Sequence, residues 1–270
     1  MAASDTVFAG AIPQLYDTWM VPMVFEAYAS DVAALVAGFA PAAVLETAAG
    51  SGVVTRALAP LLGAGARYVV SDLHQAMLDF AASRQGADGR IVWQQADALD
   101  LPFDDAAFDV VLCQFGAMFF PDRVAGFAQA HRVLRPGGHF VLSVWDRIEE
   151  NAFADAVTQA LATVFPDDPP RFLARTPHGY HDLAQIRQDL QRAGFADTVA
   201  QTHTKQSHAR SAREAAIAYC QGTPLRNEIE ARDALGLQRA TDSAEQALAA
   251  RCGPGPVRGK MQAHVIVARR

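Results

Sequence analysis

The chain has 270 residues, of which 51% are hydrophobic, and a formal net charge of -6. This length and apolar content suffice for one large domain with a full core, or for one domain with a cap. The negative charge and the dispersed arginines argue against a nucleic-acid-binding surface. We expect no apolar stretch long enough to span a bilayer, and the N-terminus lacks the basic-then-apolar layout of a signal peptide.

The three cysteines are far apart in the sequence. Cys113, Cys220 and Cys252 form no C-x-x-C pair, so the pattern indicates neither a disulfide framework nor a zinc site. These features together favour a cytoplasmic protein.

The first forty residues read as two helices. Apolar residues recur at helical spacing over 12–20, and Pro22 then opens a longer helix with one apolar stripe. Segment 8–28, with Tyr16 and Trp19, precedes the first predicted strand and has no obvious place in a sheet. Two interpretations stay open for it, namely simple packing against the body and a lid over a bound ligand.

Residues 44–55, V-L-E-T-A-A-G-S-G-V-V-T, are the most informative stretch. A short apolar run is followed by a glutamate and by a loop that contains Gly50 and Gly52. The residues after this loop have the apolar spacing of a helix. A strand, a glycine turn and a helix in this order place backbone N–H groups at a helix N-terminus facing a crevice. That geometry suits a ligand with a carboxylate or another polar group. An ordinary βα turn, in which the glycines only permit the backbone path, is the alternative.

Acidic residues follow the next two predicted strands. The second strand, 67–71, ends at Asp72, which lies 20 residues beyond the second glycine of the loop. A carboxylate at this point would accept hydrogen bonds from both hydroxyls of a ribose. Asp72 could also cap the following helix, and this role is compatible with ribose binding. The third strand, 91–95, is followed by Asp97 and Ala98.

The next stretch completes an alternating pattern. Strand 108–113 is apolar on both faces, as a central parallel strand must be, and helix 124–134 and strand 139–144 follow it. The repeated strand–helix–strand units predict an α/β, doubly wound, mostly parallel sheet with ligands at the carboxyl ends of its strands. Further helices are expected over 152–165 and 183–193.

Two histidines occur in T-P-H-G-Y-H, where they suggest a metal site or a general base. His178 and His181 lack a nearby third ligand, so we expect no metal there and favour a surface loop. A substrate-pocket role for His178 or Tyr180 stays open. Trp145 and Asp146, just past the fifth strand, are further candidates for the same rim.

Five features occur in a fixed order: V-L-E-T-A-A-G-S-G (44–52), Asp72, Q-A-D-A-L-D-L-P-F (95–103), F-D-V-V (108–111) and R-V-L-R-P-G-G (132–138). In this order and spacing they resemble the class I S-adenosylmethionine-dependent methyltransferases, in the branch that contains the ubiquinone/menaquinone-biosynthesis C-methyltransferases. One position departs from the family, because Ala48 stands where its first glycine is usual. The extra methyl narrows the loop and bears on cofactor affinity rather than on cofactor identity.

The resemblance implies a seven-stranded, Rossmann-like methyltransferase sheet within a single domain, 1–270. It implies a sixth strand near 198–205 and a final strand at 262–268. The remaining parts would be an N-terminal helical cap (1–40), a cofactor-binding core (41–145) and helical insertions (146–194 and 206–256).

The resemblance also implies roles for individual residues. The methionine end of S-adenosylmethionine would be held by Glu46 and by the loop residues Ala48, Gly50, Ser51 and Gly52. Asp72 would accept the ribose hydroxyls. Around the adenine and the sulfonium would lie Leu73, Met77, Asp97, Ala98, Gln114, Phe115 and the aromatic face of Tyr16. The substrate pocket would be lined by Trp19, Phe119, Trp145, His178 and Tyr180.

These features predict methyl transfer to a small-molecule acceptor, with S-adenosylhomocysteine as the product. A nicotinamide-dependent oxidoreductase is disfavoured, because the G-x-G-x-x-G fingerprint fails whether it starts at Ala48 or at Gly50. Base-modifying amino-methyltransferases are disfavoured too, since Gln114 and the residues after it replace a D/N-P-P-Y-like motif. A protein that binds the cofactor without turnover, as a sensor or scaffold, stays open, as does the identity of the acceptor. We nominate no general base, and expect neither a nucleic-acid partner nor membrane insertion.

Overall fold

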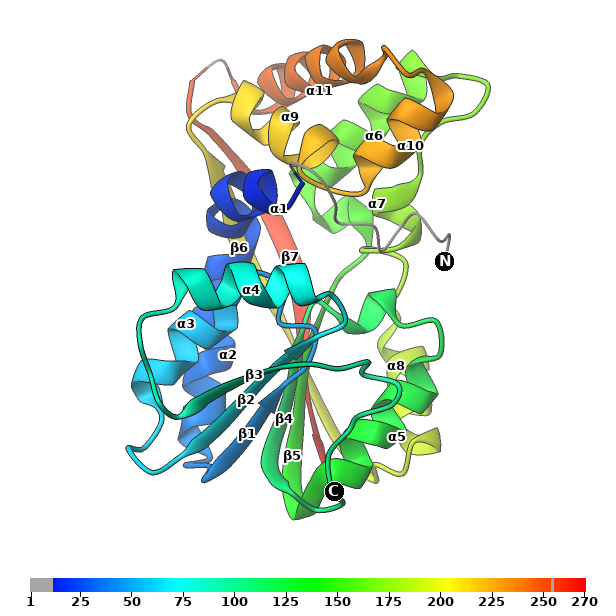
Figure 1. The fold of residues 1–270 in the computed structure, drawn as a ribbon. Coiled ribbons are helices and arrows are strands. Elements are labelled where there is room, and N and C mark those ends of the chain that lie inside the picture. Colours follow the sequence, from blue (N-terminus) through cyan, green and yellow to red (C-terminus); the bar gives the residue numbers. More distant parts are fainter. Residues whose placement is uncertain (1–11, 254) are drawn as a thin grey trace. The chain divides into compact units, whose positions relative to one another are not determined.

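The structure is a computed structural model that describes residues 12–253 and 255–270 (Figure 1). The chain divides into two compact units. Unit 1 comprises the N-terminal segment up to Ala27, Trp145–Tyr180 and His203–Ala263. Unit 2 comprises Tyr28–Val144, His181–Thr202 and His264–Arg270. Part of the expected N-terminal cap (1–40), including Phe8, lies outside the described residues.

A seven-stranded sheet has the strand order β3-β2-β1-β4-β5-β7-β6 (Figure 1). Its strands are β1 (Ala43–Glu46), β2 (Arg67–Asp72), β3 (Ile91–Gln95), β4 (Phe108–Gln114), β5 (Leu134–Trp145), β6 (Asp197–Ala209) and β7 (Val257–Arg269). Strand β1 pairs in parallel with β2 and β4, β2 with β3, and β4 with β5. The strand order reverses between β1 and β4, which is where doubly wound sheets bind ligands. The predicted fold class is confirmed, and β6 and β7 are longer than the expected 198–205 and 262–268.

The central strands are buried along their length, as their continuous apolar sequence predicts. All four residues of β1 are buried. Val44 of β1 and Val110 of β4 belong to one apolar cluster that also contains Val36 of helix α2 (Glu26–Gly38) and Leu58 of helix α3 (Val53–Leu58). Burial of such side chains contributes roughly 1.5–3 kcal/mol each, so this cluster holds the βα units of the core together.

Two helices of unit 2 begin at an aspartate that caps them. In α5 (Arg123–Val133), the Asp122 side chain accepts a hydrogen bond from the Ala125 N–H at 2.9 Å. In α8 (Leu183–Arg192), Asp182 accepts one from the Ala184 N–H at 2.8 Å. Each carboxylate satisfies a backbone donor that the first turn leaves unpaired. Unit 2 also contains α4 (Gln75–Arg84) and the short 3₁₀ helices η3 (Ala59–Leu61) and η4 (Ala117–Phe119).

The N-terminal helices differ from the expectation of a break at Pro22. Helix α1 (Ile12–Leu15), the π-helix η2 (Tyr16–Phe25) and α2 follow one another without interruption, and Pro22 lies inside η2. The Glu26 N–H donates to the carbonyl of Val21, five residues earlier. The wider π turn accommodates a residue that has no N–H to donate, so the proline does not open a new helix.

The stretch Tyr16–Gly38 is long and apolar enough to cross a membrane by length and composition. This corrects the expectation that no stretch of the chain reaches that length. A core helix of a soluble protein meets the same criteria, and 56% of the most apolar window is buried inside the protein.

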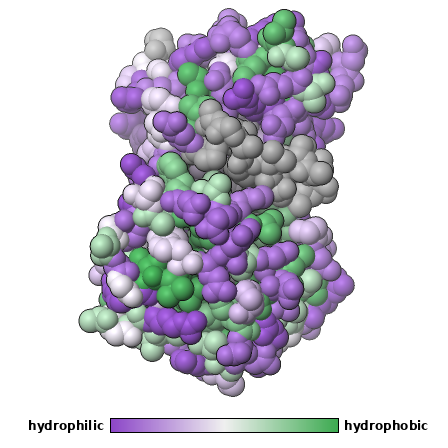
Figure 2. Space-filling view, viewed as in Figure 1, coloured by the Kyte–Doolittle hydropathy of each residue, from purple (hydrophilic) through white to green (hydrophobic). Residues whose placement is uncertain are grey.

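Unit 1 is mainly helical. It contains η5 (Ile148–Glu150), α6 (Ala152–Val164), α7 (Phe172–Arg175), α9 (Ala212–Gln221), α10 (Leu225–Arg232) and α11 (Leu237–Cys252). Helix α11 packs against α9 and α6, and its contact face consists of small and apolar residues such as Ala240, Ala244 and Leu248. The visible surface of α10 and α11 is mostly hydrophilic (Figure 2). This one-sided pattern is that of amphipathic helices packed into a bundle.

Candidate functional site

The loop after β1 follows a path that needs left-handed backbone at three positions. Ala48, Gly50 and Gly52 have φ values of 51°, 56° and 77°. Glycine adopts this region freely, whereas an alanine there is strained, so Ala48 is the unusual member. The loop is fixed at its start by the Thr47 N–H, which donates to the Leu112 carbonyl of β4 at 2.9 Å.

Asp72 at the end of β2 binds the glycine loop directly. Its Oδ2 accepts a hydrogen bond from the Gly50 N–H at 2.9 Å, and its Oδ1 accepts one from the His74 N–H at 2.9 Å. The N-cap position of α4 is His74, so Asp72 does not cap that helix by the usual bond to a first-turn N–H. The side chain is 8% exposed, and burial raises the pKa of its carboxyl, opposed by the two backbone bonds.

Glu46, the last residue of β1, is buried in a small hydrogen-bonded group. Its Oε2 accepts hydrogen bonds from the Thr55 hydroxyl at 2.7 Å and from the Tyr68 hydroxyl. Burial raises the pKa of the Glu46 carboxyl to about 7, although the bonds from Tyr68 and Thr55 work in the opposite direction. Neither partner was predicted from the sequence, because bonds from 9 and 22 residues away leave no spacing signal.

The loop after β4 packs against the glycine loop. A Cβ atom at Gly116 would lie 2.5 Å from the Cβ of Ala48, so only glycine fits this contact without movement. The preceding Phe115 has a φ of 53°, donates its N–H to the Ser143 carbonyl at 3.0 Å, and packs edge-on against Tyr28. The carboxyl end of β4 is therefore held tightly beside that of β1.

The remaining predicted residues of unit 2 lie at the ends of β2 and β3. Leu73 is 48% exposed, whereas Met77 is buried, with its Cε 3.9 Å from the position of a Cβ on Gly50. Asp97 is exposed, and its Oδ1 accepts the Leu99 N–H at 2.9 Å in a turn that also contains Ala98.

The carboxyl ends of β1 to β4 in unit 2 thus gather most of the predicted cofactor residues. These are Glu46, Ala48, Gly50, Ser51, Gly52, Asp72, Leu73, Met77, Asp97, Ala98, Gln114 and Phe115. Two buried polar atoms among them, Ser51 Oγ and Gln114 Oε1, have no hydrogen-bond partner within the part of the chain that the structure describes. Buried polar atoms are normally paired, so these two fit a polar ligand at this edge. Asp72 fits as well, since its Oδ2 and Oδ1 accept the N–H groups of Gly50 and His74 and keep further acceptor capacity.

The remaining predicted residues lie mostly in unit 1. An aromatic series there runs from Tyr16 to Phe25 (ring centroids 5.2 Å apart), on to Trp145 (5.8 Å) and on to His178 (5.9 Å). The His178 Nδ1 lies 2.8 Å from the Asp146 carbonyl oxygen, which can only accept, so Nδ1 carries the proton. The His178 side chain is only 6% exposed, so the expectation of a surface loop is wrong at this residue.

The other predicted residues complete the comparison with the sequence. Trp19 is covered by the guanidinium of Arg210 at 5.3 Å from its ring centroid, and Tyr180 is buried. Phe119 belongs to unit 2, in η4. Phe25, which links Tyr16 to Trp145, was missed, because an apolar residue on a helical stripe reads as ordinary core. The described residues contain no group of three or more metal-binding side chains.

Comparison with known proteins gives a consistent result. A family described as "Methyltransferase domain" matches residues 45–142. The demethylmenaquinone methyltransferase of Mycolicibacterium gilvum is 32% identical over 163 residues, which cover 57% of this chain and 68% of the relative. That of Clavibacter sepedonicus is 31% identical over 162 residues, covering 57% and 65%, so the similarity spans about two thirds of these relatives.

A solved structure supports the same fold. The phosphoethanolamine N-methyltransferase 2 of Haemonchus contortus, in complex with phosphomonomethylethanolamine and S-adenosylhomocysteine, is similar with a TM-score of 0.52 at 18% identity. The similarity covers 88% of this chain and 52% of that one.

Proposed function

Since the chain belongs to the S-adenosylmethionine-dependent methyltransferase family, we propose that it transfers a methyl group from S-adenosylmethionine to a small-molecule acceptor. The observation that carries the proposal is the buried Asp72 carboxylate, bound to the N–H of Gly50 in the glycine loop at 2.9 Å. This bond fixes the Asp72 carboxylate beside the glycine loop, at the point where the strand order reverses.

We assign the cofactor contacts to unit 2. Asp72 accepts the ribose hydroxyls with the lone pairs that its two backbone bonds leave. Ser51, Gly52 and Glu46 hold the methionine end, and the unpaired Gln114 Oε1 offers an acceptor at the end of β4. Leu73 and Met77 lie beside the adenine, with Asp97 and Ala98 at its edge.

When bound, S-adenosylmethionine supplies an already activated, electrophilic methyl group. The residues of this chain therefore have to align the acceptor in line and exclude water from it. The Gly116–Ala48 contact and the Phe115 N–H bond to Ser143 stiffen the loops that do so. A general base is required only for acceptors that must lose a proton, and none is assigned.

For the acceptor we propose a planar small molecule, with demethylated quinols as the first to test. The names of the relatives support this choice, as do the flat aromatic rings of Phe25 and Trp145 in unit 1. We assign acceptor binding to these two rings together with Trp19, His178 and Tyr180 of the same unit. We also propose a reducing, cytoplasmic location, because Cys113, Cys220 and Cys252 are all free thiols.

The test has two parts. Calorimetry should give saturable binding of S-adenosylmethionine and S-adenosylhomocysteine but not of NADH, and a panel of quinols, phenols and amines should release S-adenosylhomocysteine with at least one acceptor. Binding without turnover across the whole panel would support a sensor or scaffold instead. Binding of NADH alone would contradict the cofactor assignment.

A further inference from the structure

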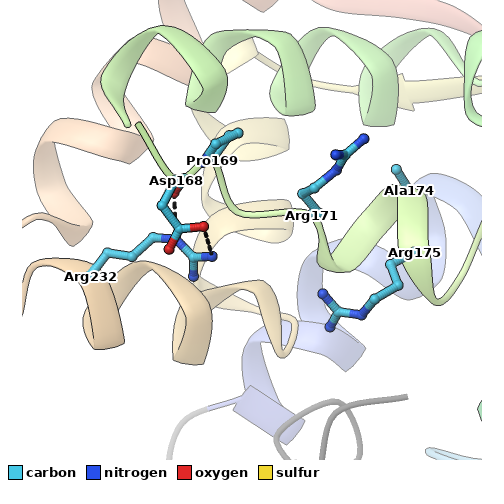
Figure 3. Close-up of a pocket in the computed structure, with 6 residues that line it drawn as sticks. All are labelled: Asp168, Pro169, Arg171, Ala174, Arg175 and Arg232. Atoms are coloured by element: carbon cyan, nitrogen blue, oxygen red, sulfur yellow. Dashed lines mark hydrogen bonds and ion pairs between the residues drawn. The ribbon is translucent and has the colours of Figure 1, made fainter. Parts of the chain in front are cut away.

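A cavity in unit 1 is lined by arginines. It has a volume of about 520 Å³ and its walls are formed by Asp168, Pro169, Arg171, Ala174, Arg175 and Arg232 (Figure 3). These residues come from the turn after α6, from α7 and its start, and from the end of α10. The volume lies within the range of small-ligand pockets, roughly 300–1,000 Å³.

Two of the three arginines are tied to carboxylates. Arg232 donates to Asp168, from Nε to its carbonyl at 2.7 Å and from a terminal nitrogen to its Oδ1 at 3.1 Å (Figure 3). Arg175 pairs with Glu228 Oε1 at 2.8 Å. The exposed fractions are 76% for the Asp168 side chain and 10% for that of Glu228, so the first pair is solvated and the second is built into the wall.

Glu228 also fixes the chain that carries Arg171. Its Oε2 accepts the backbone N–H of Arg171 at 2.7 Å and that of Phe172 at 3.2 Å. The charge of Glu228 is therefore engaged by Arg175, by two backbone donors and, at 3.9 Å, by Arg232. No ion pair joins it to the guanidinium of Arg171 among the described residues.

The Arg171 guanidinium has no hydrogen bond or ion pair to any residue that the structure describes. In Figure 3 it extends from its turn away from Arg175 and Arg232, whose own guanidinium groups are directed towards each other's side of the cavity. Three arginines and two carboxylates leave this cavity with one net positive charge in a chain whose formal charge is -6. The net positive charge of these five side chains is thus local to the cavity.

We propose that this cavity binds a small molecule through an oxyanion group, a phosphate or a carboxylate, with Arg171 as its main cation. A guanidinium presents planar donors that match both groups and binds them with charge-assisted hydrogen bonds. The exposed Asp168 carboxylate repels an anion in the cavity and occupies hydrogen-bond donors of Arg232. Both effects lower the affinity of the cavity for the anion. None of the six lining residues is among the cofactor residues assigned in unit 2.

The test is a titration of the full-length protein with inorganic phosphate, and separately with succinate, at constant ionic strength. Binding is followed by NMR, and S-adenosylhomocysteine affinity is measured on the same preparations. Arg171→Gln should weaken anion binding by about fivefold or more, the scale of one solvent-exposed charge pair. Asp168→Asn should strengthen it by about twofold to fivefold for the same reason. Arg187→Gln, an exposed arginine on α8 with the same change of charge, is the matched control and should leave binding unchanged.

Saturable binding of either anion with these opposite shifts supports the proposal, and the preferred anion tells phosphate from carboxylate. The absence of saturable binding of both anions would overturn it. Equal loss with Arg171→Gln and Arg187→Gln would also overturn it, because that result reflects net charge alone. The S-adenosylhomocysteine affinity should be unchanged in all three variants. A failure of the anion-site proposal is thereby distinguished from a failure of the cofactor assignment.

Discussion

Gly116 offers the sharpest test of how the two loops of the proposed cofactor site support each other. A Cβ atom at this position would lie 2.5 Å from the Cβ of Ala48 and 2.9 Å from the Sγ of Cys113, whereas carbon atoms pack at roughly 3.5–4.0 Å. The φ of Gly116 is -102°, so alanine meets no backbone penalty here and the whole cost is steric. Cys113 is fully buried in β4, so the glycine loop that carries Ala48 is the neighbour that has to move.

Gly116→Ala should therefore lower both stability and ligand affinity. Overpacking of this kind costs about 1–3 kcal/mol, and we expect the free energy of unfolding to fall by that amount in urea denaturation. Because the strain is relieved by displacing the loop that holds the ligand, S-adenosylhomocysteine affinity should fall by about tenfold in calorimetry.

Two variants isolate the cause. Gly63→Ala adds the same methyl where nothing lies within 4 Å and should match the wild type. Ala48→Gly in the Gly116→Ala background removes the 2.5 Å contact but leaves the one to Cys113, so recovery should be partial. If Gly116→Ala is as stable and binds as tightly as Gly63→Ala, the loops do not support each other in the way we argue.

Three further changes test the site. Asp72→Asn should weaken S-adenosylhomocysteine binding by roughly tenfold to a hundredfold, the worth of charge-assisted hydrogen bonds, and an unchanged dissociation constant would remove Asp72 from the ligand contacts. Burial raises the folded-state pKa of Glu46 from 4.5 to about 7, so the folded protein holds this proton more tightly than the unfolded chain does. The free energy of unfolding should therefore fall by about 3 kcal/mol as the pH rises through this window, and Glu46→Gln should flatten that slope in urea denaturation. Deletion of residues 1–20 should reduce turnover and S-adenosylhomocysteine retention in a protein that still folds. A truncation with full activity but a lower melting temperature would assign the segment to packing.

The sheet could be predicted because its signals are local. Strand 108–113 is apolar on both faces, and only a strand covered on both sides tolerates that pattern, so β4 was placed in the centre. The break expected at Pro22 was wrong for an equally local reason. Proline normally interrupts an α-helix, and nothing in the sequence announces the π-helical turn that accommodates it.

The strand positions of the predicted cofactor residues could be read from the sequence, but their hydrogen-bond partners could not. The motif placed Glu46 and Asp72 at the ends of neighbouring strands, yet their partners depend on register. Tyr68 reaches Glu46 because β2 lies beside β1 with Tyr68 opposite Val44, so the two side chains meet two residues apart along the strands. A pairing shifted by one residue would turn Tyr68 to the other face and leave the buried Glu46 carboxyl without that donor.

For the aromatic residues of unit 1, the sequence contains no motif that indicates which of them are neighbours. Tyr16, Trp145 and His178 come from three segments separated by more than thirty residues each, so no periodicity connects them. What joins them is Phe25 and the Asp146 carbonyl, an apolar ring and a backbone atom that sequence patterns cannot distinguish from ordinary core. A turn such as the glycine loop can therefore be predicted from a single sequence, because its backbone path restricts the residue types at fixed positions. A site made of side chains from distant segments constrains only shape and polarity, which many residues satisfy, and it becomes visible only when the fold brings those segments together.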